Sequence, residues 1–329
     1  MISRRMLAAG MLAILAACSP AQKQTAGQAA SGLTNIRFAT DWRAEAEQGG
    51  FYEALANGEY AKRGLNVTIV PGGPGVNVPQ LVAAGAVEMG VGSNSFIVMN
   101  LANEHVPVKA VAAFMQKDPQ VLIAHPDAGI AKIADMKGHP ILLADASITA
   151  FWIWLKSKYG FTDAQIHKYN FSNAPFLADK TIVQQGYLTS EPYTIEKEAH
   201  LRPAVFLLAD EGYPGYGGMV LAPDSMINGK PEVVRAFVEA TAAGWKSYLE
   251  GDASPGDKLI LKDNPEMTED VLAQAREKMR KYAIIGPGTM TDERWATFFK
   301  IASDGGVYPK TLNYKDAYTL ALLPGAKAP

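Results

Sequence analysis

Segments with the pattern of strands alternate with segments with the pattern of helices from residue 36 to residue 222. Ile36–Ala39 and Leu65–Val70 are expected to be strands, whereas Gly50–Arg63 and Val78–Ala84 are expected to be helices. Regular alternation of this kind favours an α/β fold in which largely parallel sheets are flanked by helices. After Pro231 the pattern becomes helical, and it predicts helices over residues 231–250, 268–282 and 292–304.

The middle of the chain continues the alternation with weaker signals. Ile141–Ala144 is expected to be a strand, Lys180–Gln185 to lie in or near a helix, and Tyr187–Thr189 to be a strand. Glu191–Ala199 is expected to be helical, because Pro192 falls in its first turn, where proline is tolerated.

The length of 329 residues exceeds what one hydrophobic core usually supports and predicts two domains. The formal net charge is −2, and no basic cluster of the kind that binds nucleic acid or acidic lipid is present in the sequence. Cys18 is the only cysteine, which excludes disulfides within the chain and zinc–thiolate sites. The histidines show no spacing typical of metal ligands, so neither a metal nor a cofactor is expected.

The N-terminal segment has the pattern of a secretory signal. Arg4 and Arg5 precede an apolar run that ends in small residues directly before Cys18. A cysteine at that place makes the segment a lipobox, so residues 1–17 are expected to be removed and Cys18 to be lipidated. Residues 18–32, rich in Gln, Ala, Ser and Gly, are expected to form a flexible tether. The alternative is an ordinary signal peptide with a chance cysteine.

Asp41 and Trp42 directly follow the first expected strand. Ligands gather at the carboxyl ends of strands in open α/β sheets, where a tryptophan can stack on a flat ring and an aspartate can accept hydrogen bonds. A packed tryptophan beside a capping aspartate is the alternative. The segment Gly72-Gly73-Pro74-Gly75 lacks the ending of a phosphate loop. It can still let a ligand approach backbone N–H groups near Gly73, with Asn77 close by.

Two further turns lead from a strand into a helix and carry small polar residues. Their candidate ligand-binding residues are Ser93 and Asn94 in the first turn, and Ser147 and Thr149 in the second. Such residues cap helix N-termini, and capping explains them without a ligand. The same geometry gathers free N–H groups, which suit an anion or a polar ring.

Glu191 stands at another turn from strand to helix. Its carboxylate can pair with the N–H donors of an aminopyrimidine, or it can simply place negative charge at a helix N-terminus. Trp152 lies one turn after Thr149 and is expected to face the ligand. Tyr213 and Tyr216 lie in a loop rich in Gly and Pro and are expected to form a lid.

The order and spacing of these motifs resemble one known family. After Asp41-Trp42 come Gly49-Gly50-Phe51-Tyr52-Glu53-Ala54, Gly64-Leu65-Asn66-Val67, Gly72-Gly73-Pro74, Leu81-Val82-Ala83-Ala84-Gly85-Ala86-Val87-Glu88-Met89-Gly90-Val91 and Thr189-Ser190-Glu191-Pro192-Tyr193. Over about residues 33 to 320 the chain resembles the solute-binding proteins of ABC importers in the nitrate/sulfonate/taurine and thiamine-pyrimidine-precursor group.

The resemblance implies a two-lobed α/β fold, the periplasmic binding protein type II fold, with one ligand in the cleft. Lobe 1 is expected over residues 33–117 and 222–329, and lobe 2 over residues 118–221, with crossings near 116–121 and 218–222. It also implies a binding protein that closes by hinge motion and serves an ABC permease and its ATPase. With the lipobox, this predicts a periplasmic lipoprotein. A monomer is expected, since one protein must dock on one transporter, and no enzymatic activity is expected, since the sequence shows no catalytic constellation.

Within that group, the Asp-Trp pair and the Glu before Pro look most like the binders of pyrimidine precursors. This likeness assigns ring stacking to Trp42 and recognition of the amino group to Glu191. The segment from Arg43 to Glu47 departs from many pyrimidine binders, so a flavin-type ring stays open. A sulfonate or nitrate binder ranks lower, because a buried carboxylate beside an anion is costly. A cleft enzyme acting on a pyrimidine-like heterocycle is the third alternative.

Overall fold

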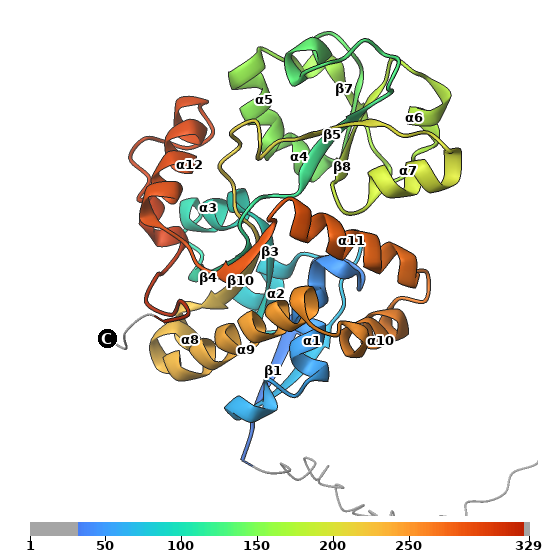
Figure 1. Cartoon of the computed structure of the whole chain (residues 1–329). Coiled ribbons are helices and arrows are strands. Elements are labelled where there is room, and N and C mark those ends of the chain that lie inside the picture. Colours follow the sequence, from blue (N-terminus) through green and yellow to red (C-terminus); the bar gives the residue numbers. More distant parts are fainter. Residues whose placement is uncertain (1–31, 326–329) are drawn as a thin grey trace, which may run out of the picture. The chain divides into compact units, whose positions relative to one another are not determined.

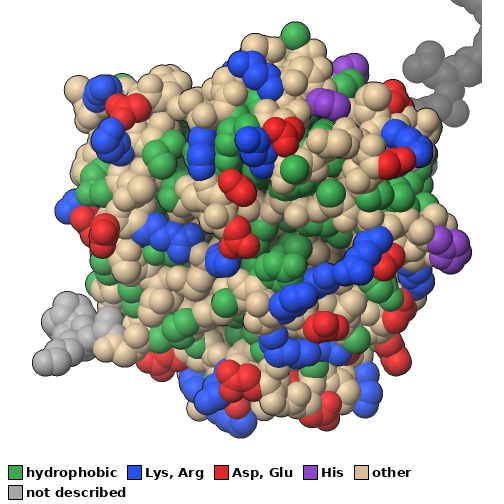
Figure 2. All heavy atoms as spheres, turned by 45° about the horizontal axis from the view of Figure 1, so that its top comes forward, with side chains coloured by type: hydrophobic (Ala, Val, Ile, Leu, Met, Phe, Trp, Pro, Cys, Tyr) green, Lys and Arg blue, Asp and Glu red, His purple; other side chains and the backbone are tan. Residues whose placement is uncertain are grey.

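A computed structural model describes residues 32–325 of the chain. The expected leader, Cys18 and nearly all of the expected tether lie outside the described residues. Within the described range, no helix is both long enough and apolar enough to cross a membrane. Residues 33–325 belong to one compact unit (Figure 1). Basic and acidic side chains are interspersed on the face of the molecule that Figure 2 shows.

Two β-sheets form the framework of this unit (Figure 1). The six-stranded sheet has the order β11-β4-β10-β3-β1-β2, with β1 (Thr34–Ala39), β2 (Leu65–Val70), β3 (Met89–Asn94), β4 (Val108–Met115), β10 (Gly217–Pro223) and β11 (Ile285–Gly288). The five-stranded sheet has the order β7-β6-β8-β5-β9, with β5 (Gln120–Ala124), β6 (Ile141–Leu143), β7 (Ile166–Lys168), β8 (Val183–Tyr187) and β9 (Ala204–Leu207). Most strands of each sheet run in one direction, whereas β10 and β11 in the first and β5 in the second oppose their neighbours.

Helices cover both sheets. Those in the first two thirds of the chain are short: α1 (Gly49–Ala56), α2 (Val78–Ala83), α3 (Ser95–Asn103), α4 (Asp145–Ile148), α5 (Phe151–Tyr159), α6 (Ala174–Ala178), α7 (Glu191–Ala199) and α8 (Asp224–Gly229). The last third carries α9 (Pro231–Glu250), α10 (Ser254–Asp263), α11 (Glu269–Lys281) and α12 (Asp292–Asp304). The expectation of a helical end to the chain is thereby confirmed, with α10 as an addition.

The chain passes from the six-stranded to the five-stranded sheet through residues 116–119 and returns through residues 208–216. The return lies earlier than the expected crossing near 218–222, because those residues belong to β10, which is paired with β3 and β4. The second sheet is therefore built entirely from the middle of the chain.

Two elements differ from their sequence-based predictions. The helix expected over Gly50–Arg63 ends at Ala56, because Gly58 takes a left-handed φ of 68° that a helix cannot continue. Lys180–Gln185 is not a helix: β8 begins at Val183 and runs between β6 and β5. Its glutamines masked the strand pattern, although Gln184 is fully buried and donates a hydrogen bond to Asn173. Of the strand expected over Tyr187–Thr189, Tyr187 is the last residue of β8, and residues 188–189 form the turn that follows it.

Close helix contact organises the core beneath the six-stranded sheet. A Cβ added to Gly244 of α9 would lie 2.2 Å from the carbonyl oxygen of Gly50 in α1, so only glycine fits there. Phe51 of α1 packs near Phe38 of β1, with ring centroids 4.6 Å apart. The glycines of α1 therefore serve packing against α9.

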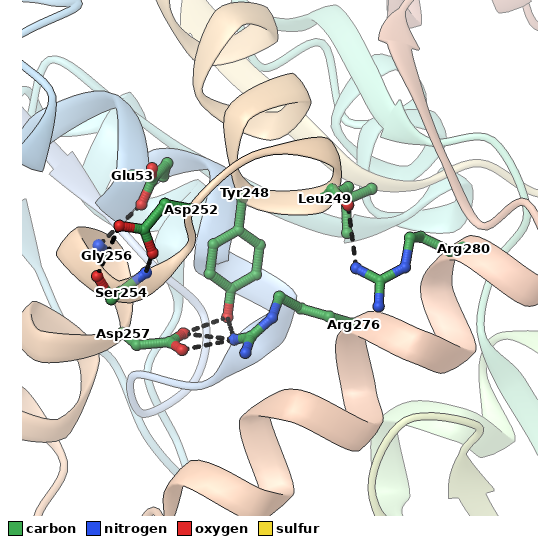
Figure 3. A network of polar contacts seen from close by, with 9 residues as sticks. All are labelled: Glu53, Tyr248, Leu249, Asp252, Ser254, Gly256, Asp257, Arg276 and Arg280. Carbon is green, nitrogen blue, oxygen red and sulfur yellow. Dashed lines mark hydrogen bonds and ion pairs between the residues drawn. The ribbon is translucent and has the colours of Figure 1, made fainter.

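A polar network links the helices of the same region (Figure 3). Arg276 of α11 donates to both carboxylate oxygens of Asp257 in α10, at 2.7 and 2.6 Å, and Tyr248 of α9 donates to the same carboxylate at 2.9 Å. Glu53 of α1 accepts a hydrogen bond from the backbone N–H of Gly256 at 2.8 Å. The side chains of Arg276 and Asp257 are only 15% and 14% exposed, so this ion pair is shielded from solvent.

Candidate functional site

A cavity of about 330 Å³ is lined by residues of both sheets and their loops. Loops after β1 and β3 contribute one part of the wall, and the segments around β6, β7 and β8 contribute another. The polar lining residues are Asp41, Glu45, Glu47, Gln48, Ser93, Asn94, Asn100, Asp118, Gln120, Ser147, Thr149, Gln185, Tyr187, Ser190, Glu191 and Tyr213. Five further aromatic residues line the cavity: Trp42, Phe51, Phe96, Phe151 and Phe171.

The Asp41-Trp42 loop is fixed by the turn that follows β2. Gly72 donates its backbone N–H to the carbonyl of Trp42 and to the hydroxyl of Thr40, each at 3.1 Å. A Cβ at Gly72 would lie 2.2 Å from the carbonyl oxygen of Thr40, so the two loops could not approach with any other residue. Trp42 is thereby positioned at the carboxyl end of β1, where the strand pattern placed it.

Five carboxylates line the cavity: Asp41, Glu45, Glu47, Asp118 and Glu191. Among the described lining residues, none is Lys, Arg or His. Burial raises the pKa of Glu45 well above its ordinary value, and the negative charges of Glu47 and Glu191 raise that pKa further. Burial also raises the pKa of Asp41 and of Glu47. The cavity is therefore an electronegative site that disfavours anions.

Local hydrogen bonds orient three of these carboxylates. Ser93 donates its hydroxyl to Asp41, and Thr189 donates its hydroxyl to Glu47. Glu191 accepts hydrogen bonds from the backbone N–H of Tyr187 at 2.7 Å and from the hydroxyl of Tyr169 at 3.3 Å. The pKa of Glu191 is nevertheless raised, because burial outweighs these bonds. Each carboxylate oxygen has two lone pairs, so acceptor capacity remains for a ligand.

An aromatic pair stands beside the carboxylates. The ring centroids of Trp42 and Phe171 are 5.1 Å apart, with an interplanar angle of 45°. Phe171 is 53% exposed and has a left-handed φ of 58°, which is unfavourable for a residue with a Cβ. A large apolar ring that is both exposed and held in a strained backbone conformation is typical of a functional position.

Eight of the residues singled out from the sequence line the cavity: Asp41, Trp42, Ser93, Asn94, Ser147, Thr149, Glu191 and Tyr213. The helix N-termini beside them offer fewer free backbone N–H groups to a ligand than expected. The side chain of Asn94 caps α3 by accepting from the N–H of Phe96 at 3.0 Å, and the N–H of Ala144 is taken by Gln185 at 2.6 Å. Capping thus accounts for Asn94, while Ser93 is engaged with Asp41.

The structure does not bring Gly73 or Asn77 to the cavity. The turn that contains Gly73 supports the Asp41-Trp42 loop from behind, through the N–H of Gly72. Asn77 caps α2, its side chain accepting from the N–H of Gln80 at 3.1 Å. Both residues stabilise local structure.

Trp152 and Tyr216 also lie outside the lining. Because α5 begins at Phe151, that residue faces the cavity, and Trp152 is fully buried with its indole N–H donated to Asp163 at 2.9 Å. Tyr216 is 2% exposed beneath the guanidinium of Arg294, which lies 3.8 Å from the ring centroid. Of the two tyrosines expected to form a lid, Tyr213 therefore lines the cavity and Tyr216 is buried outside the lining.

Sequence reasoning missed several lining residues. Glu45 and Glu47 stood in a segment noted only for departing from a pattern, although two acidic residues shortly after a strand that ends in Asp41-Trp42 were a usable signal. Phe171 carried no such signal, because its position depends on a backbone conformation that the sequence does not encode locally. Asp118 was likewise invisible, since its burial arises from long-range packing.

Comparison with known proteins identifies the relatives of this chain. The profile of the family described as NMT1/THI5 like matches residues 45–252, more than half of the chain. The riboflavin-binding protein RibY of Chloroflexus aurantiacus is 24% identical over 99% of both chains.

Solved structures show the same fold at low identity. The periplasmic aliphatic sulphonate binding protein SsuA from Escherichia coli superposes with a TM-score of 0.69 at 14% identity, covering 90% of this chain and 95% of that one. The desulfurization enzyme DSZB superposes with a TM-score of 0.57 at 10% identity, covering 88% and 97%. The expected α/β fold of periplasmic binding proteins is thus confirmed.

Proposed function

The chain belongs to the NMT1/THI5-like family, and from that premise we propose that it is the solute-binding protein of an ABC importer. It captures a small planar nitrogen heterocycle in the cavity and delivers it to a permease and its ATPase. The expected signal and lipobox place it in the periplasm, anchored through Cys18. It acts as a monomer without a cofactor.

The observation that carries the proposal is the combination of an aromatic pair with unpaired acceptors. Trp42 and Phe171 offer ring faces for stacking, and Glu191 and Asp41 offer acceptors for ring N–H or amino groups. A heterocycle with several N–H donors satisfies both features at once. Burying such a ligand also relieves the mutual repulsion of the carboxylates, because each donor stabilises a negative charge.

The acidic lining argues against the sulfonate or nitrate alternative. An anion would lie beside several buried carboxylates with no cation among the described lining residues to offset them. The fold shared with a sulphonate binding protein therefore does not extend to the ligand, since function resides in the site and not in the fold.

Two heterocycle classes remain, and one observation favours each. Glu191 at the turn into α7 supports a thiamine-pathway aminopyrimidine. A cavity of about 330 Å³ lies at the lower end of the range of about 300–1,000 Å³ found for small-molecule pockets, which leaves room for a ring system larger than one pyrimidine. That volume, together with the named ligand of the relative in Chloroflexus aurantiacus, supports a flavin.

A thermal-shift series on residues 19–329 tests the proposal. Aminopyrimidines, thiamine, riboflavin, free nucleobases, sulfonates and nitrate are each compared, and a ligand at 100 times its Kd adds about 2.7 kcal/mol of stability. A rise in Tm with a heterocycle supports the proposal, and a rise only with the anions refutes it. Product analysis after incubation separates binding from turnover, because a binding protein returns its ligand unchanged.

The anchor is tested separately. Cys18→Ala should shift the full-length protein from the membrane fraction to the soluble periplasmic fraction without altering ligand binding. Retention of that variant in the membrane fraction would refute lipidation at Cys18.

A further inference from the structure

Asp118 lies in the first of the two connections between the sheets, residues 116–119. It is 1% exposed, yet it lines the cavity. The second connection, residues 208–216, brings Tyr213 to the same cavity, where it is 3% exposed. The two segments about which the lobes would hinge thus each contribute a buried polar side chain to the ligand site.

The carboxylate of Asp118 forms few hydrogen bonds within the protein. One oxygen accepts a hydrogen bond from the backbone N–H of Gln120 at 3.1 Å, and within residues 32–325 the other oxygen receives none. The hydroxyls of Tyr187 and Tyr213 likewise form no hydrogen bond with the described residues, and Oε1 of Gln120 is buried without a partner. These groups share one neighbourhood, because all four residues line the same cavity. Burial and, after it, the charge of Asp118 raise the pKa of both Tyr187 and Tyr213.

Arg294, whose positive charge acts on Asp118, forms no ion pair with its carboxylate. Arg294 donates instead to the carbonyls of Pro214 and Gly215, at 2.8 and 2.7 Å. A buried carboxylate without a charged partner is costly, and proteins keep such groups where a ligand supplies the missing donor.

We propose that Asp118 is a second recognition point, which accepts an N–H or O–H donor from the ligand at the connections between the lobes. This inference rests on the proposed function and deepens it: the ligand carries donors both on its ring, for Glu191 and Asp41, and at the end that reaches Asp118. A hydroxylated side chain or a second amino group meets this requirement. A ligand seated there contacts both connections, so its binding favours one hinge position.

The test compares Asp118→Asn with Asp210→Asn. Asn keeps the acceptor for the N–H of Gln120 but removes the charge. Asp210 lies in the second connection, is paired with Lys117 at 2.6 Å and does not line the cavity. Titration calorimetry with riboflavin and with a hydroxymethyl aminopyrimidine should show affinity about 10- to 100-fold weaker for Asp118→Asn, as expected for a lost hydrogen bond to a charged group, and unchanged for Asp210→Asn.

The melting temperature of the ligand-free protein at pH 8 supplies a second readout. Asp118→Asn should keep or raise Tm, because it removes an uncompensated buried charge. A fall of about 4 °C or more would assign Asp118 to the folding of its turn and overturn the proposal, as would unchanged affinity. If neither probe binds the unaltered protein, the proposed function is what fails, and the Tm comparison still decides whether Asp118 is structural.

Discussion

Thr189, in the turn after β8, donates its hydroxyl to the buried carboxylate of Glu47, in the turn before α1. Thr189 follows a strand of the five-stranded sheet and Glu47 follows a strand of the six-stranded sheet, so this hydrogen bond links the walls that the two sheets contribute to the cavity. Gln274 of α11 donates to the carbonyl of the same Thr189 and strengthens the link. The hydroxyl of Thr189 thus holds the two walls together and also supplies a donor to one of the buried acidic groups.

Replacement of Thr189 by Val should therefore weaken ligand binding. The change keeps the shape but leaves Glu47 without its donor, at a cost of about 1–3 kcal/mol. Affinity is expected to fall about 5- to 100-fold, as measured by titration calorimetry. Thr189→Ser retains the hydroxyl and should bind like the unaltered protein. Equal losses of affinity in Thr189→Val and Thr189→Ser would show that the hydrogen bond to Glu47 does not support binding.

Removal of the Trp42 ring should abolish stacking. Trp42→Ala is expected to lose about tenfold or more in affinity, because an aromatic contact contributes about 0.5–1.5 kcal/mol beyond the area that it buries. Trp42→Phe should retain part of the binding. The ring lies against Phe171 at the surface of the cavity and not in the core, so Tm without ligand should change little in either variant. Unchanged affinity in Trp42→Ala would refute the stacking role.

Two substitutions of Phe171 distinguish its effect on ligand binding from its effect on stability. Phe171→Ala and Phe171→Gly both remove the ring and should weaken binding alike. Only glycine also relieves the left-handed φ of 58°, which costs about 1–2 kcal/mol for a residue with a Cβ. Chemical denaturation should therefore find Phe171→Gly about 1 kcal/mol more stable than Phe171→Ala. Equal stability of the two would mean that the loop relaxes once the ring is gone.

The Arg276–Asp257 pair should contribute strongly to stability. Arg276→Met leaves a carboxylate that is 14% exposed without its cation, and the expected loss is about 3 kcal/mol in urea unfolding. Lys62→Met is the matched control, because its ion pair with Glu59 involves a lysine that is 62% exposed and should contribute less than about 0.5 kcal/mol. Similar losses at both sites would contradict the role of burial.

The pH dependence of stability should change in Asp118→Asn. Burial raises the pKa of Asp118 to about 7, with Arg294 opposing the rise and the hydroxyls of Tyr187 and Tyr213 nearby. The folded protein therefore holds a proton that the unfolded chain releases near pH 4, so this group lowers stability as pH rises from about 4 through 7. Asp118→Asn should gain stability relative to the unaltered protein at pH 8 and not at pH 4. A difference independent of pH would contradict this.

Sequence patterns predicted the elements whose signals are local. The helical spacing of apolar residues identified α9, and the flanking turn residues identified β2. The positions of Asp41, Trp42 and Glu191 after strand ends predicted that they line the site. The glutamines of β8 hid a central strand, because their burial depends on partners far away in the sequence, as with Gln184 and Asn173. Trp152 misled because its distance from Thr149 was counted along one continuous helix, whereas α5 begins at Phe151, and Phe151 lines the cavity while Trp152 is fully buried.

The contact between Gly244 and Gly50 has a consequence for how the site can diversify. With 2.2 Å between a hypothetical Cβ on Gly244 and the carbonyl oxygen of Gly50, α1 and α9 meet backbone to backbone at this point, which leaves little freedom for the two helices to shift. The wall that carries Glu47 and Phe51 is therefore rigid, and any adjustment to a new ligand must come from the opposite wall, around Phe171 and Tyr187. Among relatives of this protein, we expect substitutions that change ligand preference to fall in the middle third of the chain, and we expect Gly50 and Gly244 to stay unchanged.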